Sequence, residues 1–106
     1  MFDDKIVLCV SNSYEEKFYL NEDFSSLPKD VKDELKIMCV LYTEEIGGIL
    51  SLEFDEEGTL EMVVRAEVDD FLFDEIGSVL KIKQLREVKR DLLESLETYY
   101  KVFFLS

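Results

Sequence analysis

Hydrophobic and polar residues alternate along four short stretches of the chain, and each stretch predicts a β-strand. The four ranges are 5–10, 16–21, 49–55 and 59–68. In the third stretch, Leu50, Leu52 and Phe54 share one face, which we expect to line the core. In the fourth, the even-numbered residues from Leu60 to Val68 are expected to point the same way. The acidic turn between these two stretches ends in glycine and predicts a β-hairpin.

The first two stretches are joined by a serine–asparagine–serine turn and predict a second antiparallel hairpin. In the first stretch, strict alternation places Ile6, Leu8 and Val10 on one face. It places Val7 and Cys9 on the other face. Because both faces are apolar, we expect this strand to be largely buried.

A helical period replaces the alternation over residues 28–46, where apolar residues recur every three or four positions. The serines before Pro28 and the proline itself are typical of a helix start. Gly47 supplies a left-handed stop. These signals predict one helix between the two hairpins.

A second helical pattern follows Asp69-Asp70, which can cap a helix, and it continues without proline to Leu105. Gly77 is the weak point, where a kink or a restart is expected. Residues 78–104 would form one helix of about 40 Å at 1.5 Å per residue. Such a helix would overhang a domain of this size.

The predicted order β-β-α-β-β-α favours a single α+β domain over residues 1–106. We expect an antiparallel sheet of two hairpins with both helices on one face and a long C-terminal helix. The order of the strands within the sheet does not follow from the sequence.

The strong negative charge of the chain limits the classes of molecule that it can bind. The chain carries a formal net charge of −13, and residues 53–75 hold ten acids against one arginine, a net −9 (10 − 1). Such a surface repels phosphate backbones and anionic lipids and favours cationic partners. We therefore expect no binding to nucleic acid or to membranes.

Several kinds of chemistry are excluded by residues that the chain lacks. It has no histidine, which removes histidine-based triads and most zinc sites. Gly47-Gly48 is interpreted as a helix stop and not as a phosphate cradle. Cys9 and Cys39 lie among apolar neighbours and are expected to be buried thiols; a redox pair would need Cα atoms within about 7 Å. We expect neither a cofactor nor an enzymatic activity.

Two weaker hypotheses use the carboxylates. A divalent cation could bind the acids around the second helix start, namely Asp69, Asp70, Asp74 and Glu75. A pair of carboxylates could act as acid and base, either Asp70 with Asp74 or Glu53 with Glu61. Charged residues at a hairpin or a helix start are usually solvated surface, so both hypotheses stay secondary.

The last helix combines a basic stretch with an apolar end. Residues 81–90 carry five basic residues and one acid. They are interpreted as a solvated face partly paired with the acidic cluster, or as a surface by which one copy recognises another. Heptad spacing along 82–103 would suit a short coiled coil, but packing of this stripe on the protein's own sheet is favoured.

The C-terminal end is apolar on more than one side, and a surface of that kind must be covered. We therefore expect a homodimer. The residues expected at its interface are Leu92, Leu96, Tyr99, Tyr100, Phe103 and Phe104.

The chain resembles an uncharacterised family of small acidic bacterial proteins of unknown function. The resemblance covers nearly the whole length and rests on the stretches 19–21, 31–41, 45–48, 71–78 and 99–104. It implies no activity, cofactor or site. In size, acidity and element order the chain is also similar to secretion-chaperone-like folds, which are dimeric and bind client segments, although the leading helix of that pattern is missing.

The acidic start and the absence of an apolar run near 20 residues predict a soluble, cytoplasmic protein. The favoured function is that of a small, non-catalytic interaction protein, an adaptor or chaperone-like homodimer. Its partner would carry a basic or apolar segment, contacted by the acidic hairpin or by the apolar C-terminal end. The alternatives are a cation-binding protein and a carboxylate-dependent enzyme.

Overall fold

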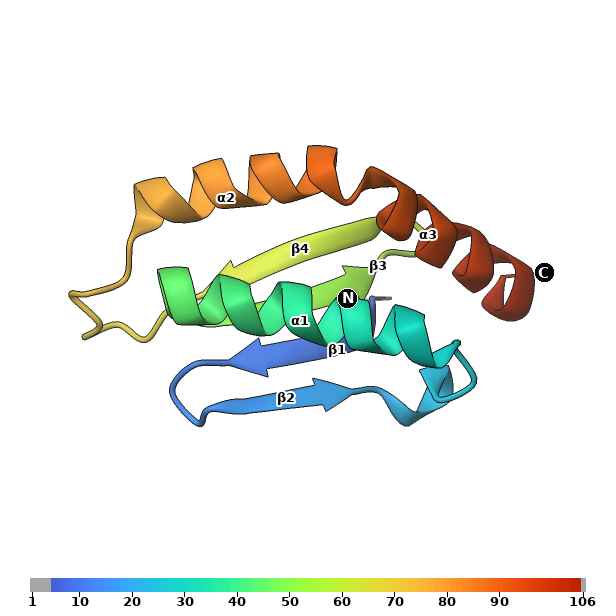
Figure 1. The fold of residues 1–106 in the computed structure, drawn as a ribbon, viewed down its shortest axis with the longest axis horizontal. Coiled ribbons are helices and arrows are strands. Elements are labelled where there is room, and N and C mark those ends of the chain that lie inside the picture. Colours follow the sequence, from blue (N-terminus) through green and yellow to red (C-terminus); the bar gives the residue numbers. More distant parts are fainter. Residues whose placement is uncertain (1–4, 106) are drawn as a thin grey trace.

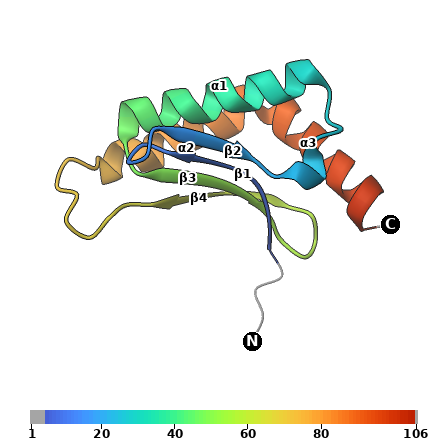
Figure 2. The same ribbon diagram turned by 90° about the horizontal axis from the view of Figure 1, so that it is seen from below.

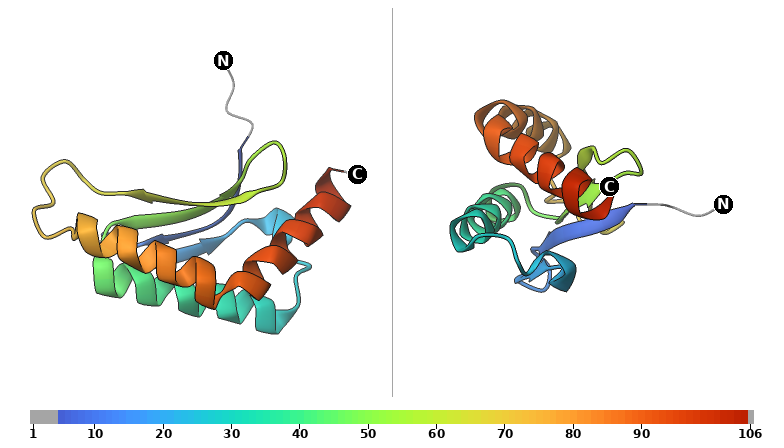
Figure 3. Two further views of the ribbon diagram at one scale, coloured as in Figure 1. Left: turned by 90° about the horizontal axis from the view of Figure 1, so that it is seen from above. Right: turned by 90° about the vertical axis from the view of Figure 1, so that its right-hand side faces the viewer.

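A four-stranded antiparallel sheet carries the α-helices on one of its faces (Figures 1 and 3). The computed structural model describes residues 5–105. The strands are β1 (Ile6–Asn12), β2 (Lys17–Leu20), β3 (Ile49–Phe54) and β4 (Leu60–Arg65). The helices are the short 3₁₀ helix η1 (Glu22–Phe24), α1 (Lys29–Ile46), α2 (Glu75–Val88) and α3 (Arg90–Phe104). The predicted α+β class, the antiparallel sheet and the two hairpins are confirmed.

The strand order is β2-β1-β3-β4, so the first strand of each hairpin lies in the middle of the sheet and the second lies at an edge. β1 and β3 are antiparallel neighbours, with Ile6 opposite Phe54 and Asn12 opposite Ile49. Side chains on both faces of β3 are buried, from Leu50 to Phe54. As predicted, Leu50, Leu52 and Phe54 lie in the core.

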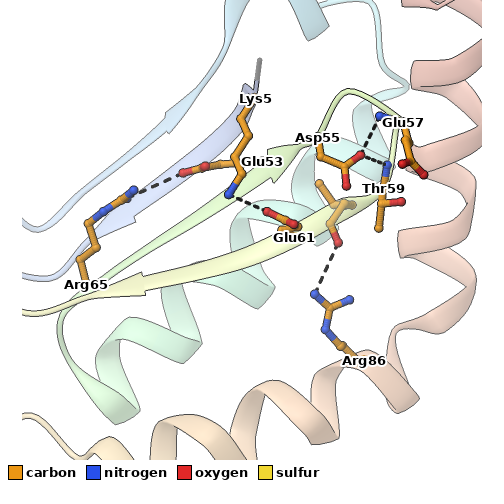
Figure 4. A network of polar contacts seen from close by, with 9 residues as sticks. Lys5, Glu53, Asp55, Glu57, Thr59, Glu61, Arg65 and Arg86 are labelled. Atoms are coloured by element: carbon orange, nitrogen blue, oxygen red, sulfur yellow. Dashed lines mark hydrogen bonds and ion pairs between the residues drawn. The ribbon is translucent and has the colours of Figure 1, made fainter. Parts of the chain in front are cut away.

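The β3–β4 hairpin is closed by its acidic turn. Asp55 Oδ1 accepts hydrogen bonds from the backbone N–H groups of Glu57 and Thr59, both at 2.9 Å (Figure 4). Gly58 has a φ of 86°, a left-handed conformation that glycine adopts without strain. The turn sequence therefore fixes a register in which Phe54 lies opposite Leu60.

The prediction of strict alternation along β1 was wrong, because a β-bulge interrupts the strand. The pairing with β3 shifts between Val7 and Cys9, which leaves Leu8 as the extra residue. As a result, both Leu8 and Cys9 are buried in the core. Val7 lies opposite Glu53 and is 37% exposed.

The prediction of α1 is confirmed to within a residue. Its apolar stripe buries Leu35, Met38 and Tyr42. The helix ends at Ile46, and the following Gly47 has a φ of 92° and donates its N–H to Thr43 O at 2.9 Å. The hydroxyl groups of Ser11 on β1 and Thr43 on α1 share a hydrogen bond of 2.8 Å. The buried Ser11 hydroxyl, which points from the sheet toward the helix, therefore has a hydrogen-bond partner.

The prediction of one long C-terminal helix was wrong. Residues 66–74 form a loop, α2 begins at Glu75, and the helix breaks at Lys89, where φ is −104° and ψ is 21°. Gly77 lies in the first turn of α2 and is not the break. The bend directs α3 across the end of the sheet, and its last turn extends beyond the sheet (Figure 3).

The fourth strand is also shorter than predicted, since β4 ends at Arg65. Leu60 is buried, and Met62 and Val64 pack against the core, as predicted. Ala66 and Val68 lie beyond the strand and are exposed. The chain has already left the sheet for the loop at this point, so these two side chains do not face the core.

An aromatic cluster closes the opposite end of the sheet. The ring of Tyr100 stacks on Phe54 with centroids 4.2 Å apart and 8° between the planes. Phe104 stacks on Tyr100 at 5.1 Å and on Phe24 at 4.8 Å. Figure 2 shows α3 crossing this end of the sheet next to η1. Stacking of this kind adds about 0.5–1.5 kcal/mol per pair to the burial of the rings.

Among residues 5–105, no helix combines the length and the hydrophobicity that a membrane crossing needs.

The aromatic cluster predicts an asymmetry between two identical substitutions. Phe24→Ala should lower the free energy of unfolding by about 3–5 kcal/mol, because a fully buried ring leaves a cavity. Phe71→Ala should change it by no more than about 0.5 kcal/mol, because the Phe71 side chain is 91% exposed. Urea denaturation of the two variants measures both values. Equal losses would contradict this view of the core.

Candidate functional site

The loop between β4 and α2 and the first turns of α2 expose a group of large apolar side chains. We call this group the loop–helix surface; its members are Val68, Phe71, Leu72, Ile76, Val79 and Leu80. Phe71 is 91% exposed and Leu72 is 93% exposed. The loop projects beyond the end of the sheet (Figure 1). Large exposed apolar groups are unusual on a monomer and typically mark a binding site.

The loop is anchored on both sides, so its exposed residues have a defined position. Tyr14 donates its hydroxyl hydrogen to Asp70 Oδ2 at 2.6 Å and accepts the N–H of Glu67 at 3.0 Å. The bond to the Asp70 carboxylate raises the pKa of Tyr14. On the other side, Phe73 lies over Gly48: a Cβ at Gly48 would meet the Phe73 ring at 2.8 Å. The outward orientation of Phe71 and Leu72 is therefore built into the loop.

The acidic residues of the predicted cation site have separate roles in this loop. Asp70 holds Tyr14 and also accepts the N–H of Leu72 at 3.0 Å. Asp74 caps α2 by accepting the N–H of Gly77 at 2.8 Å. Asp69 and Glu75 are exposed. Within residues 5–105, no three acidic or cysteine side chains are grouped as metal ligands.

The second predicted carboxylate pair lies on the face of the sheet turned away from the helices. Glu53 and Glu61 are opposite each other on β3 and β4. Glu53 is only 6% exposed and lies 3.7 Å from Arg65 Nη1, while Glu61 pairs with Lys5 Nζ at 2.8 Å (Figure 4). Each carboxylate thus has its own cation. This arrangement balances charge along the strands and accounts for both glutamates.

The basic residues of α2 mostly bind within the chain. Lys81 pairs with Glu45 at 3.0 Å, and Lys89 pairs with Glu34 at 3.1 Å. The expected intramolecular pairing is thus found, but with α1 and not with the acidic cluster. These two ion pairs fasten α2 to α1 and leave the acids of residues 67–75 without those cations.

The six residues predicted for a dimer interface have different environments. Leu92, Leu96 and Tyr100 are buried in the chain's own core. Tyr99 is half-buried, and its hydroxyl shares a hydrogen bond of 2.6 Å with Ser26. Phe103 is 67% exposed, and Phe104 lies at the edge of the aromatic cluster. Only the last turn of α3 therefore offers apolar surface.

The two thiols meet in the core beneath α1. Cys9 Sγ and Cys39 Sγ are 3.9 Å apart, and both cysteines are free and buried. The contact with Cys39 and the burial raise the pKa of Cys9 well above its usual range. The expectation of buried thiols is confirmed.

Sequence reasoning missed the loop–helix surface because periodicity cannot separate a helix from a loop that contains Phe71-Leu72-Phe73. The available signal was the pair of acidic residues on each side of this apolar triplet, which interrupts both the period of a strand and that of a helix. Exposure of Ile76, Val79 and Leu80 depends on how far α1 and the sheet extend, which is a property of the fold.

Comparison with known proteins connects the chain to a family without a known function. The model of a family of unknown function, DUF6145, matches residues 5–106. A search of the curated proteins and a search of the solved structures each gave no significant match. The resemblance to an uncharacterised family is thereby confirmed, and it brings no activity with it.

The burial of the two thiols predicts that they react slowly with thiol reagents in the native protein. Because both thiols are buried, and because the pKa of Cys9 is raised while the thiolate is the reactive form, a disulfide reagent at pH 8 should leave both native thiols essentially unmodified. Unfolding in guanidinium should release two thiols, and a Cys39→Ala variant should release one. Rapid reaction of either cysteine in the native protein would contradict the buried geometry.

Proposed function

The chain belongs to DUF6145, a family of unknown function, and we propose that it is a non-catalytic protein-binding module, an adaptor or chaperone-like protein. The loop–helix surface is the binding site. The observation that carries this proposal is the exposure of six large apolar side chains on an anchored loop and one helix face. Ile76, Val79 and Leu80 follow the i, i+3, i+4 spacing of a single helix face.

Charge around this surface selects the partner. Glu67, Asp69, Asp74 and Glu75 surround the apolar residues, and all four are exposed. An apolar centre with a charged rim is the usual anatomy of a protein interface. Since the rim is acidic, the partner presents a basic segment that also carries apolar residues.

The same charge disfavours other classes of partner. Nucleic acids and anionic membranes carry phosphates, which a protein with a net charge of −13 repels. We place the protein in the cytoplasm, because its two cysteines are buried in the core as small apolar residues, as is common in proteins of reducing compartments.

A homodimer formed by the end of α3 is the second part of the proposal. Val102 is 54% exposed, Phe103 67% and Leu105 45%, and they lie at the opposite end of α3 from the break at Lys89. Pairing two such ends would cover this apolar group and leave both loop–helix surfaces accessible. Leu92, Leu96 and Tyr100, which were predicted to lie in the dimer interface, are buried in the chain's own core and are not part of this proposed interface.

A matched pair of variants tests the binding surface. Phe71→Ser/Leu72→Ser should abolish capture of the partner from a lysate of the source organism, because these two side chains form the centre of the apolar group. Ile37→Ser/Leu41→Ser removes two exposed apolar residues of α1, 59% and 57% exposed, and should leave capture unchanged. Quantitative mass spectrometry compares both variants with the wild type. Loss of the partner only in the α1 variant would show that the proposed surface is wrong.

Light scattering tests the dimer. At tens of micromolar the mass should be twice the chain mass of 12.4 kDa. Phe103→Ser/Leu105→Ser should return it to the single-chain mass without loss of secondary structure in circular dichroism, since both side chains are at least 45% exposed. A single-chain mass for the wild type would refute assembly through α3.

A further inference from the structure

β4 is an edge strand, and its outer edge is open over part of its length. In the β3–β4 hairpin, the N–H of Asp55 donates to Thr59 O at 3.0 Å, so Thr59 turns its backbone groups toward β3. In an antiparallel pair this direction alternates along the strand, so every second residue after Thr59 also turns its backbone groups toward β3. These are Glu61, Val63 and Arg65. The alternate residues Leu60, Met62 and Val64 therefore direct their N–H and C=O groups outward.

Contacts at Leu60 confirm this direction. The N–H of Leu60 donates to Glu97 Oε2 of α3 at 2.7 Å. Its carbonyl oxygen accepts from Arg86 Nη2 of α2 at 3.4 Å (Figure 4). One end of the edge is thus closed by side chains. For Met62 and Val64, the structure of residues 5–105 shows no such closing contact.

A cleft opens beside the unclosed part of the edge. It has a volume of about 610 Å³ and is bordered by the end of β4, the loop and the first turn of α2. Its apolar lining consists of Val64, Ala66, Val68, Phe73 and Ile76. Its polar lining is entirely acidic: Glu67, Asp70, Asp74 and Glu75. α2 packs on α1 and α3, which leaves this space between its first turn and β4.

We propose that the partner enters this cleft as an extended segment and adds to β4 as a fifth strand. This deepens the proposed function, on which it rests, by specifying the form and composition of the bound segment. The segment exchanges backbone hydrogen bonds with Met62 and Val64, as in other cases of strand addition. It carries lysine or arginine residues in alternation with apolar ones.

Alternation follows from the two faces of the sheet. Successive side chains of an added strand point to opposite faces. Those on the helix side meet Val64, Phe73 and Ile76 and are apolar. Those on the other side lie on the face that carries Glu61 and Arg65, where Glu61 is paired with Lys5 and Arg65 with Glu53. The negative charge that favours lysine or arginine in the segment therefore comes from the carboxylates of the cleft, among them Glu67 and Glu75.

Charge also distinguishes this occupant from a second copy of the chain. Edge-to-edge pairing of two β4 strands would bring together two segments that each carry a net −9 over residues 53–75. Like charges at that distance oppose association. The other sheet edge, β2, has only four residues and is a poorer template than the six of β4.

Synthetic nonapeptides with capped ends test the proposal on the intact protein. A peptide of alternating lysine and valine should bind, and one of alternating glutamate and valine should not; fluorescence anisotropy measures both. The lysine peptide should slow hydrogen exchange of the Met62 and Val64 amides by about tenfold or more, because they become hydrogen-bonded. The same peptide with every second backbone amide N-methylated keeps its charge but cannot complete the ladder, and should bind about tenfold more weakly.

Variants locate the site. Glu67→Gln/Glu75→Gln removes two charges from the cleft and should weaken binding of the lysine peptide several-fold. Glu56→Gln/Glu57→Gln removes the same charge from the exposed hairpin turn at the other end of β4 and should have little effect. Val64→Pro deletes one outward N–H, which an edge strand tolerates, and should also weaken binding.

Three results would overturn the proposal. Binding of the lysine peptide without protection of the Met62 and Val64 amides would place the segment elsewhere and leave the proposed function intact. Protection of these amides in the protein alone, increasing with its concentration, would show that a second copy occupies the edge. If the lysine peptide does not bind, the proposal that an extended basic segment adds to β4 is wrong. The capture experiment with Phe71→Ser/Leu72→Ser would still decide the proposed function.

Discussion

The stacking of Tyr100 on Phe54 determines where the C-terminal half of the chain can lie. With centroids 4.2 Å apart and planes 8° from parallel, the two rings hold α3 across the end of the sheet where β3 finishes. Phe104 and Phe24 extend the stack, so the last turns of α3 and the short η1 helix are fixed together. A straight helix from residue 75 onward could not place Tyr100 there and also bury Leu85. The break at Lys89 follows from that constraint, and the ion pair of Lys89 with Glu34 fastens the bend to α1.

α3 packs across one end of the sheet, and the last turn of α1 and the first turns of α2 lie over the other end (Figure 1). α2 reaches it only with its first turns, and those turns face the core with Ser78, a small polar residue that shares a hydrogen bond of 2.6 Å with Tyr42. Ile76, Val79 and Leu80 consequently point away from the core. The loop before α2 is held by Tyr14 and by the Phe73 ring over Gly48, and this leaves Phe71 and Leu72 exposed. Exposure at this end thus follows from the way the loop is anchored and from the face that α2 turns outward.

The sequence was sufficient for the elements that local chemistry determines and insufficient for those that depend on tertiary contacts. The β3–β4 hairpin and α1 could be predicted because Asp55, Gly58, Pro28 and Gly47 specify their ends. The bulge at Leu8, the end of β4 at Arg65 and the break at Lys89 could not, because each depends on a neighbouring element. Lys89 is an ordinary helix residue by propensity, and the bend accompanies tertiary contacts of α3 that the sequence does not specify, among them the stacking of Tyr100 on Phe54. The acidic cluster was identified from the sequence, but its association with an open strand edge required the strand order.

An open edge is normally a hazard, because unpaired backbone groups bind other strands indiscriminately. In this protein the hazard is confined in two ways. At Leu60 the edge is closed by Glu97 and Arg86, so pairing cannot extend along the whole of β4. At Val64 the edge is open, but the carboxylates beside it give every approaching copy of the same protein a like charge to meet. In the proposed complex, backbone pairing is therefore limited to a short register, and charge limits it to cationic strands. A net charge of −13, which by itself only disfavours compaction, would then select what the edge accepts.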